Sequence, residues 1–558
     1  MTSQPPPSRI YFCVHIKLSV IQYYYPNSTE AMAQIESFEN PVLDMFATPQ
    51  FDDSIAYSEE YEIYEQHGSK IDRDVKTLSF QVADKNAFYD LSESRVQLRF
   101  KIVKKADESA FTAYSPAGAD PVAVPAIRAD EVLLAASSSA LFKGAKLTID
   151  GVDIETVAHA HIRGLLLDLL EYRDADKASA DQQWIYPEKR VYDFDNNVDT
   201  TGQVGTVAAV STNPSALARL ARHDSNVSGV EVELWIPLRK FFGFVRNNRA
   251  ALITQSMQIN FEIAADGMGI IKRRGGTAVA YVAGNPVAIP PVPTIPAAMG
   301  TWLDDGTARI TWCSLWLRKV VPTDKYKAEI ITTLGNRSQY KRMWIQHDTY
   351  KLDPVPDSAG SNRQFRIAHK YAKLGRIYVV AMAYPKTIGS GRLQGFVLGE
   401  NANMGHQAQF YNPGMFDCVK WTSAHVQVNG TTIPAKPYKM DFDKGQYQRV
   451  YEAWLDAVRN HNRNSKLNIP CDFETFKSSY PVLTFDVNSP GQAMYEQTSQ
   501  SEIYVSVDMA DSPVMSAYGD AAQGTDKEYV LYAVVESYRS VVLETGEGFM
   551  KVASVSAM

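Results

Sequence analysis

Two ten-residue stretches that lie about half of the 558-residue chain apart carry the same pattern, and this repetition constrains the fold more than any other feature. Residues 145–154 alternate apolar and polar side chains up to an Asp-Gly pair, and residues 424–433 do the same up to an Asn-Gly pair. Asp, Asn and Gly tolerate the positive φ angles that a two-residue hairpin turn requires. Each stretch therefore predicts a β-hairpin, with its turn at Gly151 or Gly430.

A helical pattern follows each hairpin at nearly the same offset, which extends the repeat. Apolar residues that share one helical face follow the first hairpin: Ala158, Ile162, Leu165, Leu166 and Leu169. The second hairpin is followed by a longer apolar face of the same spacing: Tyr447, Val450, Tyr451, Trp454, Leu455 and Val458. The chain is therefore predicted to contain two tandem copies of one β-rich unit.

Length and composition favour the same organisation. A chain of 558 residues is too long for one ordinary domain, and two units of roughly 200–250 residues match the size of β-sandwich domains. The 30 tyrosines and 23 phenylalanines favour strands, because aromatic side chains suit half-buried pleated surfaces. We expect an all-β protein of two tandem units with short helices in its loops.

The charge argues against a protein that mainly binds nucleic acid. The formal net charge is −7, whereas phosphate neutralisation needs a basic surface. The longest basic runs, Lys104-Lys105 and Lys272-Arg273-Arg274, are short and are interpreted as solvated loop charges. The four cysteines are not spaced as a zinc site or a redox pair, which predicts buried or unused thiols in a reducing compartment: Cys13, Cys313, Cys418 and Cys471.

These signals divide the chain into five predicted parts. An N-terminal arm (1–56) precedes a first unit (57–321), a helical linker (322–340), a second unit (341–545) and a C-terminal tail (546–558). Within the linker, Asp324–Leu334 is the predicted helix. Two interpretations of residues 1–31 stay open: translation begins at Met32, or these residues are a translated part of the arm, disordered or not. Residues 10–25 are too short and too polar for a transmembrane helix and lack the features of a signal peptide.

Strand patterns and loops fill the two units. Apolar or alternating runs predict strands at 75–82, 95–103, 230–244, 257–263, 308–320, 342–350, 375–383, 482–487, 502–507 and 529–538. Segments 106–130, 190–229 and 275–300 predict long loops, the last because it holds five prolines. We interpret this proline segment as a loop within the first unit, because residues 308–320 close the first sheet better than they open a second.

No catalytic motif is found in the sequence, and no catalytic, cofactor-binding or metal-binding residue is predicted. His159 and His161 are interpreted as polar residues at the start of a buried helix, because no further metal ligand lies at a diagnostic spacing. The acidic pairs Asp52-Asp53, Glu59-Glu60 and Asp304-Asp305 could supply the two carboxylates of a glycosidase, but are interpreted as solvated turns. Trp454 is expected in the core.

Several segments in this order resemble the major capsid proteins of the Polinton/Maverick, polinton-like virus, adintovirus and virophage group. The first unit contributes Phe142-Lys-Gly-Ala-Lys-Leu-Thr-Ile-Asp-Gly-Val152, the helix up to Leu170-Glu-Tyr172, Gln183-Trp-Ile-Tyr186 and Trp316-Leu-Arg-Lys-Val320. The second contributes Val426-Gln-Val-Asn-Gly-Thr-Thr-Ile-Pro-Ala-Lys-Pro437, Asp441-Phe442 and Tyr532-Ala-Val-Val-Glu-Ser-Tyr538. Each segment alone is degenerate, and their shared order is what makes the resemblance specific.

The resemblance implies a double jelly roll, that is, two tandem eight-stranded jelly rolls, with a structural role. Three chains would form a homotrimer whose six jelly rolls make a pseudo-hexameric capsomer, and capsomers would tile an icosahedral shell. It implies neighbouring capsomers, penton and minor capsid proteins as partners, a virion location, and assembly inside the host cell. It implies no enzyme activity, no cofactor, no specific nucleic acid and no membrane span. The arm before residue 57 would be a candidate to reach beneath adjacent capsomers.

One alternative from another class remains. A tandem β-sandwich could bind or process carbohydrate, which would require convergent carboxylates or a row of exposed aromatic side chains. The sequence offers no such cluster.

Overall fold

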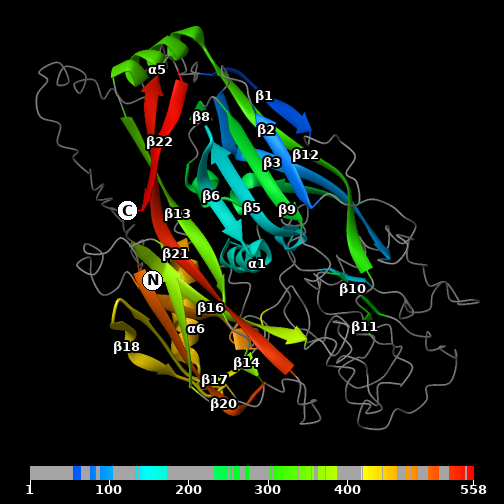
Figure 1. The fold of residues 1–558 in the computed structure, drawn as a ribbon, viewed down its shortest axis with the longest axis vertical. Coiled ribbons are helices and arrows are strands. Elements are labelled where there is room, and N and C mark those ends of the chain that lie inside the picture. The colour runs from blue at the N-terminus through cyan, green and yellow to red at the C-terminus, as the bar shows by residue number, and fades with distance from the viewer. Residues whose placement is uncertain are drawn as a thin grey trace, which may run out of the picture. The chain divides into compact units, whose positions relative to one another are not determined.

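The computed structural model describes most of the chain from Ile55 to Ala557 (Figure 1). Outside the described residues lie 1–54, 65–75, 83–87, 105–131, 135–137, 172–231, 249–251, 254–255, 264–270, 275–301, 304–305, 337–338, 353–354, 357–361, 371–372, 386–415, 417–418, 443, 462–472, 474–475, 478–480, 488–500, 515–526, 547–548 and 558. The three long predicted loops, most of the arm and all cysteines except Cys313 therefore lie outside the described residues, as do two acidic pairs, Asp52-Asp53 and Asp304-Asp305.

Eight strands between Ile55 and Pro322 form what we call the first set. They are β1 (Ile55–Tyr64), β2 (Thr77–Val82), β3 (Phe88–Lys104), β5 (Phe142–Ile149), β6 (Val152–Ala158), β7 (Val232–Pro237), β9 (Met257–Ile263) and β12 (Gly306–Pro322). All pairings are antiparallel, in two sheets: sheet 1A, ordered β1-β12-β3-β7, and sheet 1B, ordered β2-β9-β5-β6.

Eight further strands form the second set in the same order. They are β13 (Gln339–Lys351), β15 (Asn362–His369), β16 (Leu374–Pro385), β17 (Val419–Val428), β18 (Thr431–Lys439), β19 (Leu483–Asp486), β20 (Ser501–Val514) and β21 (Lys527–Gly546). Sheet 2A is ordered β13-β21-β16-β19, and sheet 2B is ordered β15-β20-β17-β18. In both sets the first, eighth, third and sixth strands make one sheet, and the second, seventh, fourth and fifth make the other. The tandem repeat predicted from the hairpins is thus confirmed at the level of topology.

Short elements complete the described structure. Helices and 3-10 turns are η1 (Ser138–Leu141), α1 (Ala160–Glu171), η5 (Leu238–Lys240), α4 (Gly243–Asn247), α5 (Asp324–Asn336) and α6 (Gln448–His461). Extra strands are β4 (Val132–Leu134), β8 (Leu252–Ile253), β10 (Ile271–Arg274), β11 (Trp302–Leu303), β14 (Val355–Pro356) and β22 (Phe549–Ala557). Strands β4, β10 and β11 make a small sheet, β8 pairs with β3, and both β14 and β22 pair with β21.

The two hairpin turns have the geometry that their residues predict. Asp150 and Gly151 have φ angles of 51° and 79°, and Asn429 and Gly430 have φ angles of 49° and 84°. Both residues of a type I′ turn require positive φ, which Asp and Asn tolerate and glycine adopts freely. The hairpins β5–β6 and β17–β18 are therefore confirmed, and α1 and α6 follow them as predicted.

Each set has its own apolar core, and each core also contains residues of the other set. Although α1 lies within the first set in sequence, between β6 and β7, its leucines cluster with the second core. Conversely Trp344, Val541, Leu543 and Val552, from β13, β21 and β22, cluster with the first core. Figure 1 shows the long strand β21 running beside β13 and β22 toward the first set. The two sets therefore bury apolar surface against each other.

The structure corrects the predicted face of α1. Ala158 ends β6 and is exposed, and the helix begins at Ala160. Residues on every side of α1 are buried, including Arg163 and Asp168. A helix is buried all round only when it has neighbours on every side, and α1 contacts elements of both sets. By contrast α6 is amphipathic as predicted, with Trp454 fully buried and Glu452 exposed.

Four other predictions change in the structure. The strand predicted at 230–244 ends at Pro237, because proline lacks the N–H that a strand ladder needs; η5 and α4 follow it. The run Lys272-Arg273-Arg274 lies in β10 rather than in a loop, and Glu59-Glu60 is exposed but lies in β1 rather than in a turn. Residues 549–557 of the predicted tail form β22.

Candidate functional site

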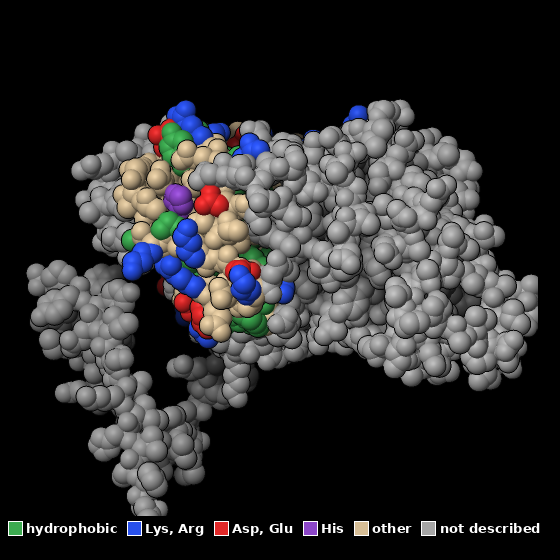
Figure 2. All heavy atoms as spheres, turned by 90° about the horizontal axis from the view of Figure 1, so that it is seen from below, with side chains coloured by type: hydrophobic (Ala, Val, Ile, Leu, Met, Phe, Trp, Pro, Cys, Tyr) green, Lys and Arg blue, Asp and Glu red, His purple; other side chains and the backbone are tan. Residues whose placement is uncertain are grey.

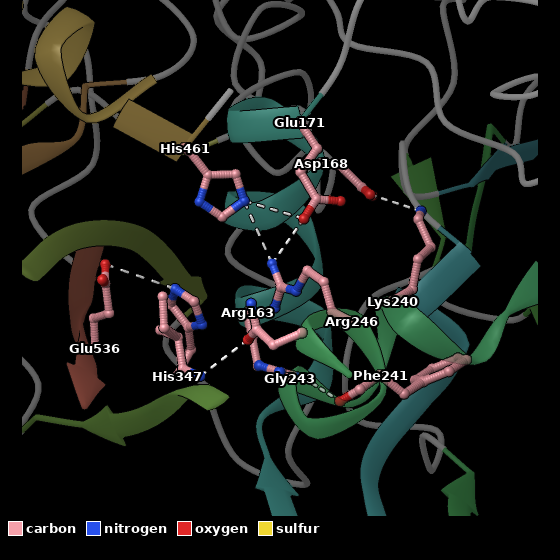
Figure 3. Close-up of polar contacts among 12 residues, drawn as sticks. Arg163, Asp168, Glu171, Lys240, Phe241, Gly243, Arg246, His347, His461 and Glu536 are labelled. Carbon is pink, nitrogen blue, oxygen red and sulfur yellow. Dashed lines mark hydrogen bonds and ion pairs between the residues drawn. The ribbon is translucent and has the colours of Figure 1, made fainter. Parts of the chain in front are cut away.

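The two sets meet at a group of buried and partly buried polar side chains that we call the joint network, part of which is drawn in Figure 3. Its members come from β6, α1, η5 and α4 on one side and from β13, α6 and β21 on the other. They are Glu155, Arg163, Asp168, Glu171, Lys240, Arg246, Gln346, His347, Asp348, His461, Glu536 and Arg539. Charges buried in a protein interior are costly unless they are paired and hydrogen-bonded, so each partner matters.

Glu155 organises the first-set side of the joint. Its Oε1 accepts hydrogen bonds from Arg163 Nη2 at 3.1 Å and from the Gly243 N–H at 3.0 Å. Its Oε2 accepts a hydrogen bond from the Phe244 N–H at 2.9 Å. Arg163 Nη1 donates to the Phe241 carbonyl. The carboxylate therefore satisfies the first N–H groups of α4 while it neutralises a fully buried guanidinium.

Helix α4 lies directly against the edge of β13. Asn247 Oδ1 accepts from the Ile345 N–H at 3.0 Å, and Asn248 Nδ2 donates to the Met343 carbonyl at 3.4 Å. A Cβ added to Gly243 would collide with the Ile345 carbonyl, so only glycine fits at this close approach. The edge strand of sheet 2A is thus covered by a helix of the first set.

Three helices converge on Glu171 at the end of α1. Arg246 Nη1 of α4 lies 2.7 Å from its Oε1, and His461 Nε2 of α6 lies 3.1 Å from the same atom. Burial favours a raised pKa of Glu171, but Arg246 and the hydrogen bond from His461 outweigh burial and hold the pKa well below its usual value. Lys240 and Asp168 form a second ion pair at 2.6 Å, with both side chains less than one tenth exposed.

The second-set side of the joint holds a buried histidine and two carboxyl groups. His347 Nε2 lies 4.0 Å from Glu536 Oε2, which accepts from Tyr378 Oη at 3.4 Å. Burial lowers the pKa of His347 well below its usual value, and Arg246, Arg163 and His461 add to that shift. Burial raises the pKa of Glu536, and it raises that of Asp348 to about 6. Burial therefore disfavours the charged form of each of these three groups.

Arg539 ties the joint to the first set. Its Nη1 donates to the Ile154 carbonyl at 3.1 Å and to Gln346 Oε1 at 2.6 Å, and its guanidinium lies over the Trp344 ring at 5.3 Å. Trp344 is 2% exposed and packs edge-on against Phe244, with ring centroids 5.3 Å apart. Polar and apolar contacts therefore cross the joint at the same place.

No family model matches the chain, and no curated protein matches it. A chain in a cryo-EM structure of the virophage Sputnik is 11% identical, with a TM-score of 0.50, and the alignment covers 94% of this chain and 93% of that chain. This likeness concerns the fold, and it agrees with the strand order found twice in the two sets. The chain is a double jelly roll.

Two further solved structures resemble this double jelly roll less closely. The mavirus major capsid protein is 10% identical with a TM-score of 0.47, covering 100% of this chain and 97% of that chain. The Faustovirus major capsid protein is 11% identical with a TM-score of 0.44, covering 89% and 92% of the two chains.

The polar groups at the joint of the double jelly roll mainly contact one another. Its carboxylates and cations are engaged with one another, and no group of three or more His, Cys, Asp or Glu side chains in the described part could hold a metal ion. His159 and His161 lie at the start of α1 with ring centroids 6.0 Å apart, and both contact the Tyr532 ring. Burial lowers the pKa of His161 to about 3.

Sequence reasoning did not find the joint network, although one signal was present. Arg163 and Asp168 interrupt an otherwise apolar helix, and a charge inside an apolar helix indicates a buried partner. The identity of those partners was not accessible, because Glu155 and Lys240 lie in other elements.

The described part of the surface seen in Figure 2 carries charges of both signs, with acidic groups among the basic ones. No helix of the described residues is long and apolar enough to cross a membrane.

Proposed function

We propose that this chain is a structural major capsid protein. In this proposal three copies form a homotrimer whose six jelly rolls make a pseudo-hexameric capsomer, and capsomers assemble into an icosahedral shell. The observation that carries the proposal is the duplication of one eight-stranded topology within a single chain. Three chains with two like units each can approximate sixfold packing while obeying threefold symmetry, which is a closed arrangement.

The joint network supports the same role. A capsomer needs its two units held at a constant angle to each other. An error in this angle would recur in each of the three chains and would keep the ring of six jelly rolls from closing. Helix α1 packs into the second core, Trp344 packs into the first core, and α4 covers the edge of β13. These contacts favour one arrangement of the two sets. The sequence resemblance to capsid proteins of the Polinton/Maverick, polinton-like virus, adintovirus and virophage group gives independent support.

The proposal extends to partners and location. Neighbouring capsomers, penton and minor capsid proteins would be its partners in a virion, after assembly inside a host cell. The chain would have no enzyme activity and no cofactor. The boundaries 57–321 and 341–545 are proposed for the two jelly rolls, with 322–340 between them.

Light scattering after size-exclusion chromatography, followed by negative-stain imaging of the same peak, tests the proposal. The expected mass is three times the chain mass of 62.2 kDa, with hexagonal particles or shells in the images. A protein that remains monomeric at every concentration would contradict it.

A carbohydrate-binding role has one observation in its favour. The outer face of sheet 1A carries Trp235 and Trp316 with ring centroids 5.5 Å apart, and Tyr64 packed edge-on against Trp312. Aromatic platforms of this kind suit sugar rings. However, the indole N–H groups of Trp235 and Trp316 already donate within the chain, and the nearby Glu233 is paired with Arg99 at 2.7 Å. A glycan-binding screen on the purified protein would decide this alternative.

A further inference from the structure

Strands β1 and β13 occupy the same place in the two sets but differ in how they are covered. Each is the first strand of its set and lies at the end of its A sheet, beside the eighth strand. The edge of β13 is covered by α4, and Trp344, Gln346 and His347 of β13 are buried. Among the described residues, β1 pairs only with β12, and none of its ten residues is buried.

The residues of β1 are unusual for an exposed edge. Ile55, Tyr57, Tyr61 and Tyr64 are 48%, 55%, 47% and 51% exposed. Tyrosine is enriched in the centres of protein interfaces, and soluble proteins normally protect a long edge strand. From the equivalence of the two strands, we infer that β1 is covered in the assembled state by a second copy of this chain.

The charges of β1 select the type of contact. Glu59, Glu60 and Glu62 would repel one another if two β1 strands met across a twofold axis. A twofold contact is thereby disfavoured, and a head-to-tail contact with a different surface is favoured. Repetition of such a contact closes a ring when the rotation fits.

The equivalence also identifies the opposing surface. In the joint, β6 and α1 of the first set face β13, and their counterparts in the second set are β18 and α6. This side of the second set exposes Lys436, Lys439 and Arg449, which complement the three glutamates of β1. The acidic residues Glu452 and Asp456 lie further along α6, where Arg459 pairs with both. The β18–α6 side of one copy therefore meets β1 of the next.

This inference rests on the proposed trimer and names its contact, and a charge-swap experiment tests it. The full chain is compared with Glu59→Lys/Glu60→Lys/Glu62→Lys, with Lys436→Glu/Lys439→Glu/Arg449→Glu, and with all six changes together. Light scattering over a dilution series gives the protein concentration at which half of the assembly has dissociated. This concentration should be about tenfold or more higher for each triple variant than for the wild-type chain. The variant with all six changes should associate again, because its opposite charges face each other once more. Glu262→Lys, at an exposed carboxylate on sheet 1B, is the matched control and should associate normally.

A cross-linking experiment identifies the occupant directly. The photo-cross-linking residue benzoylphenylalanine replaces Tyr61. Unlabelled and isotope-labelled chains are mixed, assembled and illuminated, and the cross-linked peptides are mapped by mass spectrometry. A peptide pair that combines both labels shows a cross-link between chains. Cross-links between chains to the β18–α6 region support the inference. Cross-links within one chain, including those to residues 1–54, overturn it, as do cross-links between chains to any other region.

The outcomes separate this inference from the capsid proposal. If the wild-type chain trimerises and the triple variants trimerise equally well, the β1 contact is wrong and the capsid proposal stands. If the wild-type chain never associates, both fail.

Discussion

Asp150 and Ser256 exchange two hydrogen bonds, one from each backbone N–H. The Asp150 N–H donates to the Ser256 carbonyl at 2.9 Å, and the Ser256 N–H donates to Asp150 Oδ1 at 3.0 Å. Asn429 and Glu502 repeat both contacts, each at 3.0 Å, in the second set. The turn residue therefore both reverses the hairpin and attaches it to the neighbouring strand, in each half of the chain.

Replacing Asn429 by Ala should lower the free energy of unfolding by about 1–3 kcal/mol. The substitution leaves the Glu502 N–H without its partner and puts a residue with lower tolerance of positive φ at 49°. Urea unfolding monitored by fluorescence measures the change. Thr431→Ala, an exposed neighbour in β18, should change stability by less than about 0.5 kcal/mol. Equal effects of the two substitutions would contradict the role given to the turn.

Removing Glu155 should be among the most damaging single changes. Glu155→Ala leaves Arg163 buried without its counter-charge and two N–H groups of α4 unsatisfied, which should cost about 3–5 kcal/mol. Thermal unfolding by calorimetry measures this loss. Glu262→Ala removes an exposed carboxylate paired with Lys143 and should be nearly neutral. A stable Glu155→Ala protein would show that the joint does not need this pair.

Truncation of Trp454 tests the core assignment of α6. This side chain is 0% exposed, and Trp454→Ala should cost about 3–5 kcal/mol through lost burial and the resulting cavity. The midpoint of chemical denaturation reports the effect. Glu452→Ala on the exposed side of the same helix controls for helix propensity. An unchanged midpoint for Trp454→Ala would place that indole outside the core.

Stability should fall as the pH drops below about 6.5, because burial lowers the pKa of four histidines: His159, His161, His347 and His369. His369, for example, has a pKa of about 4 in the folded chain. The unfolded chain then binds more protons than the folded chain, and each extra proton lowers the unfolding free energy by about 1.4 kcal/mol per pH unit. Asp348 and Glu536 act in the opposite direction, since their raised pKa values let the folded chain bind protons first.

Unfolding midpoints measured from pH 7.5 to pH 4.5 check this expectation. His369→Gln should flatten the dependence between pH 6.5 and pH 4, because it removes one group that must charge on unfolding. His425→Gln offers a comparison at a histidine in β17. A flat profile for the wild-type chain would mean that the carboxyl groups compensate fully.

Local signals in the sequence determined the repeated elements. Asp150-Gly151 and Asn429-Gly430 predict their turns because positive φ is a property of a few residue types, wherever the turn lies. The apolar spacing around Trp454 predicts an amphipathic helix because its burial repeats with the helical period. The order of these elements sufficed to predict two tandem units.

Tertiary structure alone decided how the two units meet. Nothing near Arg539 in sequence indicates that its guanidinium binds the Ile154 carbonyl, 385 residues away. Likewise, the apolar spacing of α1 predicted one buried face and missed its burial on all sides, because the second core that also covers it is built from strands much later in the chain. The spacing of apolar residues predicts that a side chain is buried. Which residues cover it depends on packing between segments that are far apart in the sequence. The joint, and the contrast between the covered β13 and the bare β1, follow from that packing.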